Sequence, residues 1–185
     1  MSLERKRRSD IEGLRALAVL LVVAYHFRIE PFTGGFIGVD VFFVISGFLI
    51  TKLLIDEADR EKRIQLSDFW ARRIRRIIPM SLLVVVVTVI AGLYMLEPGR
   101  ARELATVALG AIGFSANIVL YFTTDTYLSG VTPPSPLQHY WSLAIEEQFY
   151  LVWPLILFGV VKFGRAYWKA WLAGLILILG GASLA

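Results

Sequence analysis

Two polar side chains, Arg15 and His26, interrupt an apolar run that extends from Leu14 to Phe27. On an α-helix their separation corresponds to about three turns plus 20°, so both side chains project from nearly the same face. The axial distance between them is about 16 Å at ~1.5 Å per residue, which is too long for direct contact. Histidine exchanges a proton near neutral pH, whereas arginine keeps its charge and needs an anion. The pair therefore favours a long ligand over a compact catalytic dyad.

Both residues also have simpler interpretations. A histidine at the membrane interface keeps one side in water, and an arginine near the boundary can extend its head group to lipid phosphates. A charge at mid-bilayer costs on the order of 3 kcal/mol or more, so ionisable residues in apolar segments are functional candidates. Asp40 is a third such residue, because it lies with Ser46 in the apolar run 36–55.

Two further constellations follow later in the chain. In the run Arg72 to Arg76, Arg73 and Arg76 lie on neighbouring rows of a helix and offer a guanidinium surface suited to phosphate, although binding of anionic lipid is the commoner role. Ser142 and Glu146 are four residues apart and face the same side of a helix. They offer a hydroxyl and a carboxylate in one place, unless Ser142 only caps the helix and the acid only stabilises its positive end.

The composition identifies the environment. Of the 185 residues, 57% are hydrophobic and 18% are charged, which is typical of an integral membrane protein rather than a soluble domain. The chain has no cysteine, so disulfides, thiolate metal sites and a cysteine nucleophile are excluded. We expect no metal site, and no basic patch interleaved with aromatic residues points to nucleic acid.

The apolar runs predict an all-α, polytopic transmembrane bundle with about five spanning helices. The basic cluster Arg5 to Arg8 precedes the first helix, expected from 11 to 28 with Asp10 as its N-cap, so the N-terminus is expected in the cytoplasm. The polar stretch 56–76 is expected to be a cytoplasmic loop. Further helices are expected at 80–96 and 141–161 and from residue 171 onward.

Residues 104–122 allow two interpretations. The segment is long enough to span, but it contains two glycines, a serine and an asparagine. If it spans, the basic segment 162–169 falls outside the cell, against the positive-inside rule. If it re-enters the bundle, that segment lies in the cytoplasm. We favour re-entry, which requires protein or water to cover the broken backbone and itself suggests a site there.

Four motifs occur together and in order: Arg15-x10-His26, the stretch from Gly38 to Phe48 around Asp40, Arg73-x-x-Arg76-Ile-x-Pro79, and Trp141-Ser142-Leu-x-x-Glu146-Glu-Gln-Phe-Tyr150. This combination resembles the membrane-bound acyltransferase-3 family. The sequence from Ser135 to Tyr150 is similar to the corresponding motif of the O-antigen acetylase-like O-acyltransferases. The resemblance covers essentially the whole chain and corresponds to the N-terminal part of the family's domain. Because the chain stops inside an apolar run at Ala185, residues 1–185 are expected to be a truncated domain.

The resemblance implies a multi-pass enzyme of the plasma or inner membrane. It would move an acyl group, commonly acetyl, from cytoplasmic acyl-CoA to a hydroxyl of a cell-envelope carbohydrate or glycolipid. Arg73 and Arg76 would then meet the phosphates of CoA, with Arg15 at the entrance. His26 would act as general base, or as a transient acyl carrier, and Asp40 or Glu146 would orient it. Ser142 and Glu146 would position the acceptor hydroxyl.

Two other functions remain open at this stage. Buried ionisable residues also mark substrate paths in transporters and flippases, although no inverted repeat is visible. A non-catalytic fragment that assembles with a partner is the second alternative. In each case membrane lipids are the surrounding partners, and transfer of a labelled acyl group separates these classes.

Overall fold

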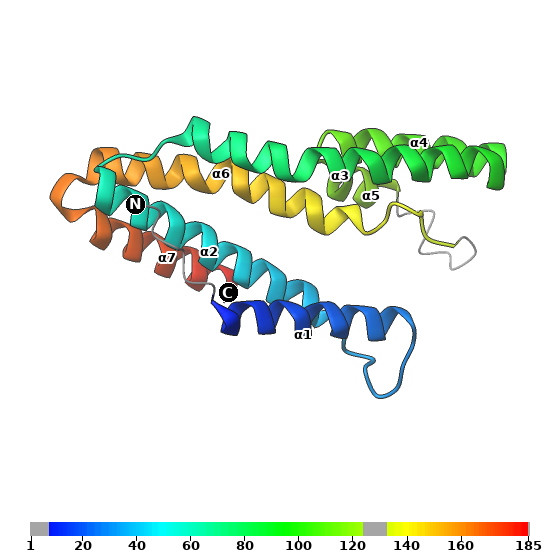
Figure 1. The fold of residues 1–185 in the computed structure, drawn as a ribbon, viewed down its shortest axis with the longest axis horizontal. Helices are drawn as coiled ribbons and strands as arrows, with labels where there is room; N and C mark the ends of the chain where they lie inside the picture. The colour runs from blue at the N-terminus through cyan, green and yellow to red at the C-terminus, as the bar shows by residue number, and fades with distance from the viewer. Residues whose placement is uncertain (1–7, 124–132, 185) are drawn as a thin grey trace. The chain divides into compact units, whose positions relative to one another are not determined.

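The computed structural model describes residues 8–123 and 133–184, and within these ranges the regular structure is helical. Figure 1 shows the order of the elements: α1 (Ser9–His26), α2 (Ile37–Glu61), α3 (Leu66–Met95), α4 (Pro98–Ile112), α5 (Ala116–Thr123), α6 (Tyr140–Gly164), the 3₁₀ turn η2 (Arg165–Tyr167) and α7 (Trp168–Leu184). The chain divides into two compact units, residues 1–55 and residues 56–185, and the boundary falls inside α2.

In the first unit, α1 and the beginning of α2 pack closely through glycine. A Cβ atom on Gly35 would lie 2.1 Å from the carbonyl oxygen of Leu21, and one on Gly38 would lie 2.4 Å from that of Ala18. Both distances are far below van der Waals contact, so any larger residue would push the helices apart. The apolar run expected from residue 36 therefore meets α1 through a surface that only glycine permits.

The start of α1 differs from the expectation. Residue Arg8 occupies the N-cap position without a side-chain cap, and Asp10 lies in the first turn. Asp10 instead pairs with Arg8 through two contacts, Nη2 to Oδ2 at 2.5 Å and Nε to Oδ1 at 3.1 Å. The predicted cap at Asp10 is wrong because the helix begins earlier, yet the acid still lies at the positive end of the helix dipole.

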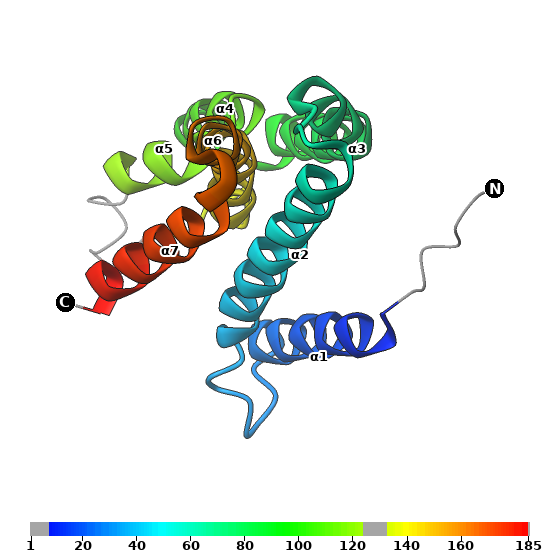
Figure 2. The same ribbon diagram turned by 90° about the vertical axis from the view of Figure 1, so that its left-hand side faces the viewer.

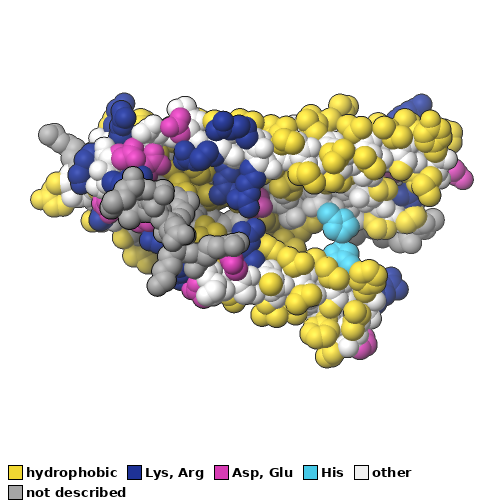
Figure 3. All heavy atoms as spheres, in the orientation of Figure 1, with side chains coloured by type: hydrophobic (Ala, Val, Ile, Leu, Met, Phe, Trp, Pro, Cys, Tyr) yellow, Lys and Arg dark blue, Asp and Glu magenta, His cyan; other side chains and the backbone are white. Residues whose placement is uncertain are grey.

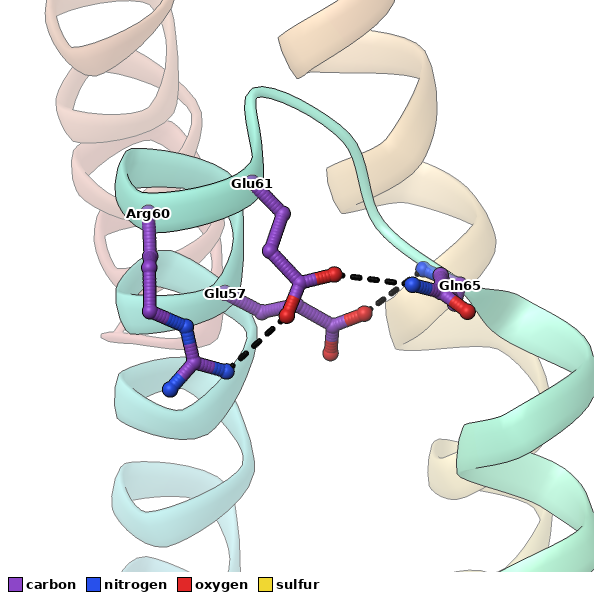
Figure 4. A network of polar contacts seen from close by, with 4 residues as sticks. All are labelled: Glu57, Arg60, Glu61 and Gln65. Carbon is purple, nitrogen blue, oxygen red and sulfur yellow. Dashed lines mark hydrogen bonds and ion pairs between the residues drawn. The ribbon is translucent and has the colours of Figure 1, made fainter. Parts of the chain in front are cut away.

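The polar stretch 56–76, expected as a cytoplasmic loop between spans, is mostly helical, and its cytoplasmic location stays a prediction. Residues 62–65 alone connect α2 to α3. Figure 4 shows how the connection is held: the backbone N–H of Gln65 donates to Glu57 at 2.8 Å, and its side chain donates to Glu61 at 2.8 Å. Glu61 also accepts from Arg60 at 3.0 Å. Most charged residues of this stretch therefore lie on solvated faces of α2 and α3, and some of them hold the short connection between the two helices.

In the second unit, α3 and α6 run antiparallel. The indole of Trp70 donates to the carbonyl of Tyr150 at 3.1 Å, and the hydroxyl of Tyr140 donates to the carbonyl of Ser81 at 2.8 Å. As the residue number rises along α3 it falls along α6, which fixes the direction. Helix α3 continues through Pro79, so the arginine run and the following apolar run form one helix.

Residues 104–122 do not form one spanning helix. The chain breaks after Ile112 and turns back at Phe114, whose φ is 50°, before α5 begins. Helix α4 has 15 residues and α5 has eight. At ~1.5 Å per residue, neither reaches the ~30 Å of a bilayer core. This is the reversal that re-entry requires; entry of the hairpin into the membrane remains a prediction.

Two contacts define the ends of the second unit. At one end, the ammonium of Lys169 pairs with Asp59 at 2.8 Å, which brings the basic segment 162–169 to the link between α2 and α3. At the other end, the guanidinium of Arg100 donates to the carbonyl of Pro133 at 2.9 Å. Helix α6 connects these ends over about 36 Å. The two basic segments therefore lie at the same end, as the re-entry interpretation predicts.

The interior of the second unit is apolar, and its outer surface suits lipid. The core consists of small and aliphatic side chains from α3, α4, α5, the segment before α6, and α6: Val85, Leu104, Val107, Ala108, Ala111, Ala116, Leu120, Leu137 and Ala144. Beyond Pro79, α3 exposes large apolar residues such as Val87 and Leu93. Figure 3 shows Lys and Arg over the first half of α3 and hydrophobic side chains over the second. Such a surface indicates a membrane protein.

Fewer helices are long and apolar enough to span a bilayer than the five or so that the sequence predicts. In the described ranges, α2, α3 and α6 are long and apolar enough to cross a bilayer. Helix α1 carries Asp10, Glu12 and Arg15 within its 18 residues, and α7 is a shorter apolar helix. Figure 2 shows the helices from the side, with α4, α5 and α6 of the second unit close together. The predicted helical membrane bundle is confirmed.

Candidate active site

Arg15 and His26 both lie on α1, as expected, and both are exposed. His26 is the last residue of the helix. Its Nδ1 lies 2.8 Å from the carbonyl oxygen of Val22. A carbonyl oxygen only accepts, so Nδ1 carries the proton and Nε2 carries the lone pair of the neutral ring. The ring of Tyr25 meets the imidazole edge to face at 5.5 Å. The helix therefore orients His26 with Nε2 as its basic atom.

Asp40 lies in the first turn of α2 and is exposed. There a carboxylate stabilises the positive end of the helix dipole, which is sufficient to explain an acid in this position. The predicted role of Asp40 in orienting His26 stays a prediction.

In the second unit, one tyrosine, Tyr150, contacts two of the predicted site residues, Arg73 and Glu146. The guanidinium carbon of Arg73, on α3, lies 4.3 Å from the ring centroid of Tyr150 on α6. The Tyr150 hydroxyl donates to Glu146 Oε1. The Arg73 guanidinium also lies 5.8 Å from the ring of Phe69. Tyr150 thus binds the guanidinium of Arg73 with its ring face across the α3–α6 contact and the carboxyl group of Glu146, on its own helix, with its hydroxyl.

Glu147 adds a second carboxylate to this cluster. Its Oε1 is buried and has no hydrogen-bond partner within the described residues. The charges of Glu146 and Arg73 both act on it. An unpaired buried carboxylate oxygen is costly, so its presence needs an explanation beyond packing. Sequence reasoning named Glu146 but gave no role to Glu147 or Tyr150. The i, i+4 spacing of Glu146 and Tyr150 is the signal that could have found the link.

Ser142 does not cap α6. The helix begins at Tyr140, which places Ser142 inside the first turn, and its hydroxyl donates to the carbonyl of His139 at 3.1 Å. The capping interpretation is therefore wrong. The helical spacing does place Ser142 and Glu146 on one side of α6, as predicted, and both are half-buried.

The arginine run divides its members between two environments. Arg73 is half-buried against α6, whereas Arg76 is exposed on α3. Arg75 donates to the carbonyl of Ala71 at 3.2 Å on its own helix. Of the predicted phosphate-binding pair, Arg76 is thus the member that faces outward, and Arg73 is held by aromatic rings.

Comparison with known proteins supplies the context for these residues. A family model described as an acyltransferase domain matches residues 8–185. The peptidoglycan O-acetyltransferase OatA of Listeria monocytogenes is 44% identical over 158 residues, which cover 85% of this chain and 25% of that protein. The putative peptidoglycan O-acetyltransferase YrhL of Bacillus subtilis is 40% identical over 147 residues, 80% of this chain and 23% of that protein.

The O-acetyltransferase OatA of Staphylococcus aureus is 42% identical over 147 residues, which cover 80% of this chain and 24% of that protein. The chain therefore spans about a quarter of the length of the curated relatives that it matches. No solved structure matches the chain.

Proposed function

The chain belongs to the acyltransferase-3 family, and on that premise we propose that it takes part in acyl transfer to a hydroxyl of a cell-envelope carbohydrate. The names of the relatives favour acetyl as the group transferred and the glycan of peptidoglycan as the acceptor. Plasma-membrane location and a cytoplasmic N-terminus belong to the same proposal. The basic segments at one end of the second unit support this orientation.

The observation that carries the proposal is the cluster of Arg73, Tyr150, Glu146 and Glu147 between α3 and α6. An acceptor hydroxyl must be held by hydrogen bonds before it attacks a carbonyl carbon. Carboxylates accept such bonds, and Tyr150 limits the freedom of Glu146. With Ser142 one turn earlier on α6, this cluster gives the acceptor hydroxyl several partners in one place.

The proposed reaction breaks the C–S bond of a thioester donor and forms a C–O ester bond on the acceptor. His26 Nε2 takes the hydroxyl proton during attack, and the imidazolium returns that proton to the departing thiolate. The contact of His26 Nδ1 with the Val22 carbonyl supports this role, because it fixes the tautomer that carries the lone pair on Nε2.

For the donor we propose an acyl-CoA, as the arginine run suggests. Arg76 is exposed and suited to bidentate contact with a phosphate. Arg73, held over Tyr150, would add positive charge behind it. Arg15 lies on α1, about 16 Å from His26 along the helix, a distance that fits an extended pantetheine arm. No metal is required for this chemistry.

Transfer of label tests the proposal. Membranes from cells that express the chain are incubated with acetyl-CoA labelled in the acetyl group and with peptidoglycan glycan. We expect alkali-labile label on the glycan, well above that from membranes without the chain. Label that stays in acetyl-CoA, or that accumulates across the membrane without ester formation, contradicts the proposal, and the second result favours a transporter.

A further inference from the structure

A pocket of about 390 Å³ lies between α5, the segment that follows residue 133, and the first turns of α6. Its lining residues come from all three elements: Asn117 and Tyr121 from α5, Ser135 and Gln138 from the segment, and Trp141 and Ile145 from α6. This volume is within the range of pockets that hold small ligands. None of the residues discussed above as catalytic or phosphate-binding lines it.

The lining has the chemistry of an uncharged polyol site. The amides of Asn117 and Gln138 and the hydroxyl of Ser135 supply donors and acceptors, and the rings of Tyr121 and Trp141 supply flat apolar surface. A sugar ring has matching parts, since its faces carry C–H groups and its rim carries hydroxyls. A phosphate or nucleotide would need cations, and no Lys or Arg is among the described residues that line the pocket. A plain acyl chain would contact the aliphatic lining residues Leu120 and Ile145 but would make no hydrogen bond with the two amides or the Ser135 hydroxyl.

The polar walls are held in place before any ligand arrives. On the α5 side, the Gln148 side chain donates to Asn117 Oδ1 at 3.0 Å and to the carbonyl of Phe114 at 2.8 Å. On the opposite side, Ser135 is buried, and its hydroxyl accepts from the backbone N–H of Leu137 at 3.4 Å. A pocket with fixed walls loses little entropy on binding, which favours a specific ligand.

The position of the pocket points to the acceptor. Trp141 and Ile145 lie on the same two turns of α6 as Ser142 and Glu146. The pocket is also at the end of the second unit where Arg100 binds Pro133, about 36 Å along α6 from the end where Lys169 pairs with Asp59. A ligand here therefore approaches the carboxylate cluster from the side opposite to the basic segments.

We propose that this pocket binds one sugar ring of the carbohydrate acceptor, an inference that rests on the proposed function. Tyr121 and Trp141 contact the C–H faces of the ring, and Gln138, Asn117 and Ser135 bind its hydroxyl or amide groups.

Binding of a defined sugar tests the assignment. The 185-residue chain in detergent micelles is titrated with the tetramer of N-acetylglucosamine, and the dissociation constant is measured by calorimetry. Trp141→Ala and Gln138→Ala are each expected to weaken binding about tenfold, with Trp141→Phe in between. The matched control is Trp171→Ala, since Trp171 is an exposed tryptophan on α7. Circular dichroism and thermal unfolding of each variant identify those that fail to fold.

The outcomes separate this inference from the proposed function. Failure of the unmodified chain to bind the tetramer, or equal affinity for Trp141→Ala, Gln138→Ala and Trp171→Ala, overturns the pocket assignment even if acetyl transfer is observed. Loss of binding in the pocket variants without any acetyl transfer by the unmodified chain supports a carbohydrate site and contradicts the proposed function.

Discussion

Arg73 and Tyr150 belong to different helices, and the guanidinium of Arg73 lies 4.3 Å from the centroid of the Tyr150 ring. The same tyrosine donates its hydroxyl to Glu146. One residue on α6 therefore fixes a cation from α3 and an anion from its own helix. This relationship joins two sequence motifs that are separate along the chain, those of Arg73 and of Glu146 with Tyr150, into one polar cluster inside an apolar bundle.

Removing the Tyr150 hydroxyl separates the contribution of that hydroxyl to activity from the packing of the tyrosine ring. Tyr150→Phe keeps the ring under Arg73 but removes the hydrogen bond to Glu146, and we expect acyl transfer to fall about tenfold because the carboxylate loses part of its orientation. Tyr140→Phe is the matched control, since it removes a hydroxyl that donates to the Ser81 carbonyl between the same helices. Both variants are expected to lose about 1 kcal/mol of stability or less in thermal unfolding. Equal activity in the two variants would assign Tyr150 a packing role only.

Arg76 is expected to act on donor binding. Arg76→Ala should raise the KM for acetyl-CoA about tenfold with little change in kcat, because an exposed guanidinium contributes to phosphate binding in ground state and transition state alike. The effect should shrink at high salt. Arg102→Ala, at an exposed arginine of α4, is the control. An unchanged KM would make Arg76 a determinant of topology.

Gln148 is expected to hold the break between α4 and α5. Its side chain donates to the carbonyl of Phe114 and to Asn117. Gln148→Leu leaves both acceptors without this donor in an apolar setting, so we expect a loss of about 1–3 kcal/mol in unfolding free energy. Combining it with Asn117→Leu should cost less than the sum of the single changes, because the orphaned amide is removed. Additive losses would show that the two side chains act independently.

Gly35 should tolerate no side chain. Gly35→Ala places a Cβ against the carbonyl of Leu21, and we expect a loss of about 2 kcal/mol or more as α1 and α2 separate. Gly34→Ala is the control, because nothing lies within 4 Å of a Cβ there. Thermal unfolding in detergent compares the two, and equal stability would refute the close contact between α1 and α2.

The hydrophobic runs predict the positions of the long helices well, whereas the charged stretches predict less about secondary structure. The apolar run 141–161 places α6 close to its observed bounds, Tyr140–Gly164, because one long apolar segment leaves few alternatives. The polar composition of the stretch 56–76 predicts a connection between spans but not how far the helices extend into it, since solvated helix faces and loops share the same polar composition. The glycines and polar residues of the run 104–122 favour a re-entrant segment, but a left-handed non-glycine residue such as Phe114 gives no clear signal for the exact position of the break.

For the candidate site too, spacing along one helix is predictable from the sequence, whereas contacts between helices are not. The helical spacing of Arg15 and His26, and of Ser142 and Glu146, follows from local periodicity and is confirmed by the helices that carry them. The contact of Arg73 with Tyr150 depends on the register of α3 against α6, which no local pattern encodes. Local spacing could link Tyr150 to Glu146, but the contact of Tyr150 with Arg73 is visible only in the folded structure.

The proposed role of His26 as general base is tested most directly by comparing the two histidines of the chain. Rates of acetyl transfer from labelled acetyl-CoA to peptidoglycan glycan are measured in membranes that carry the unmodified chain, His26→Gln or His139→Gln at matched expression. Loss of the general base predicts a fall of about a hundredfold or more for His26→Gln, whereas His139→Gln should remain close to the unmodified chain. Normal transfer by His26→Gln would show that His26 is not the general base.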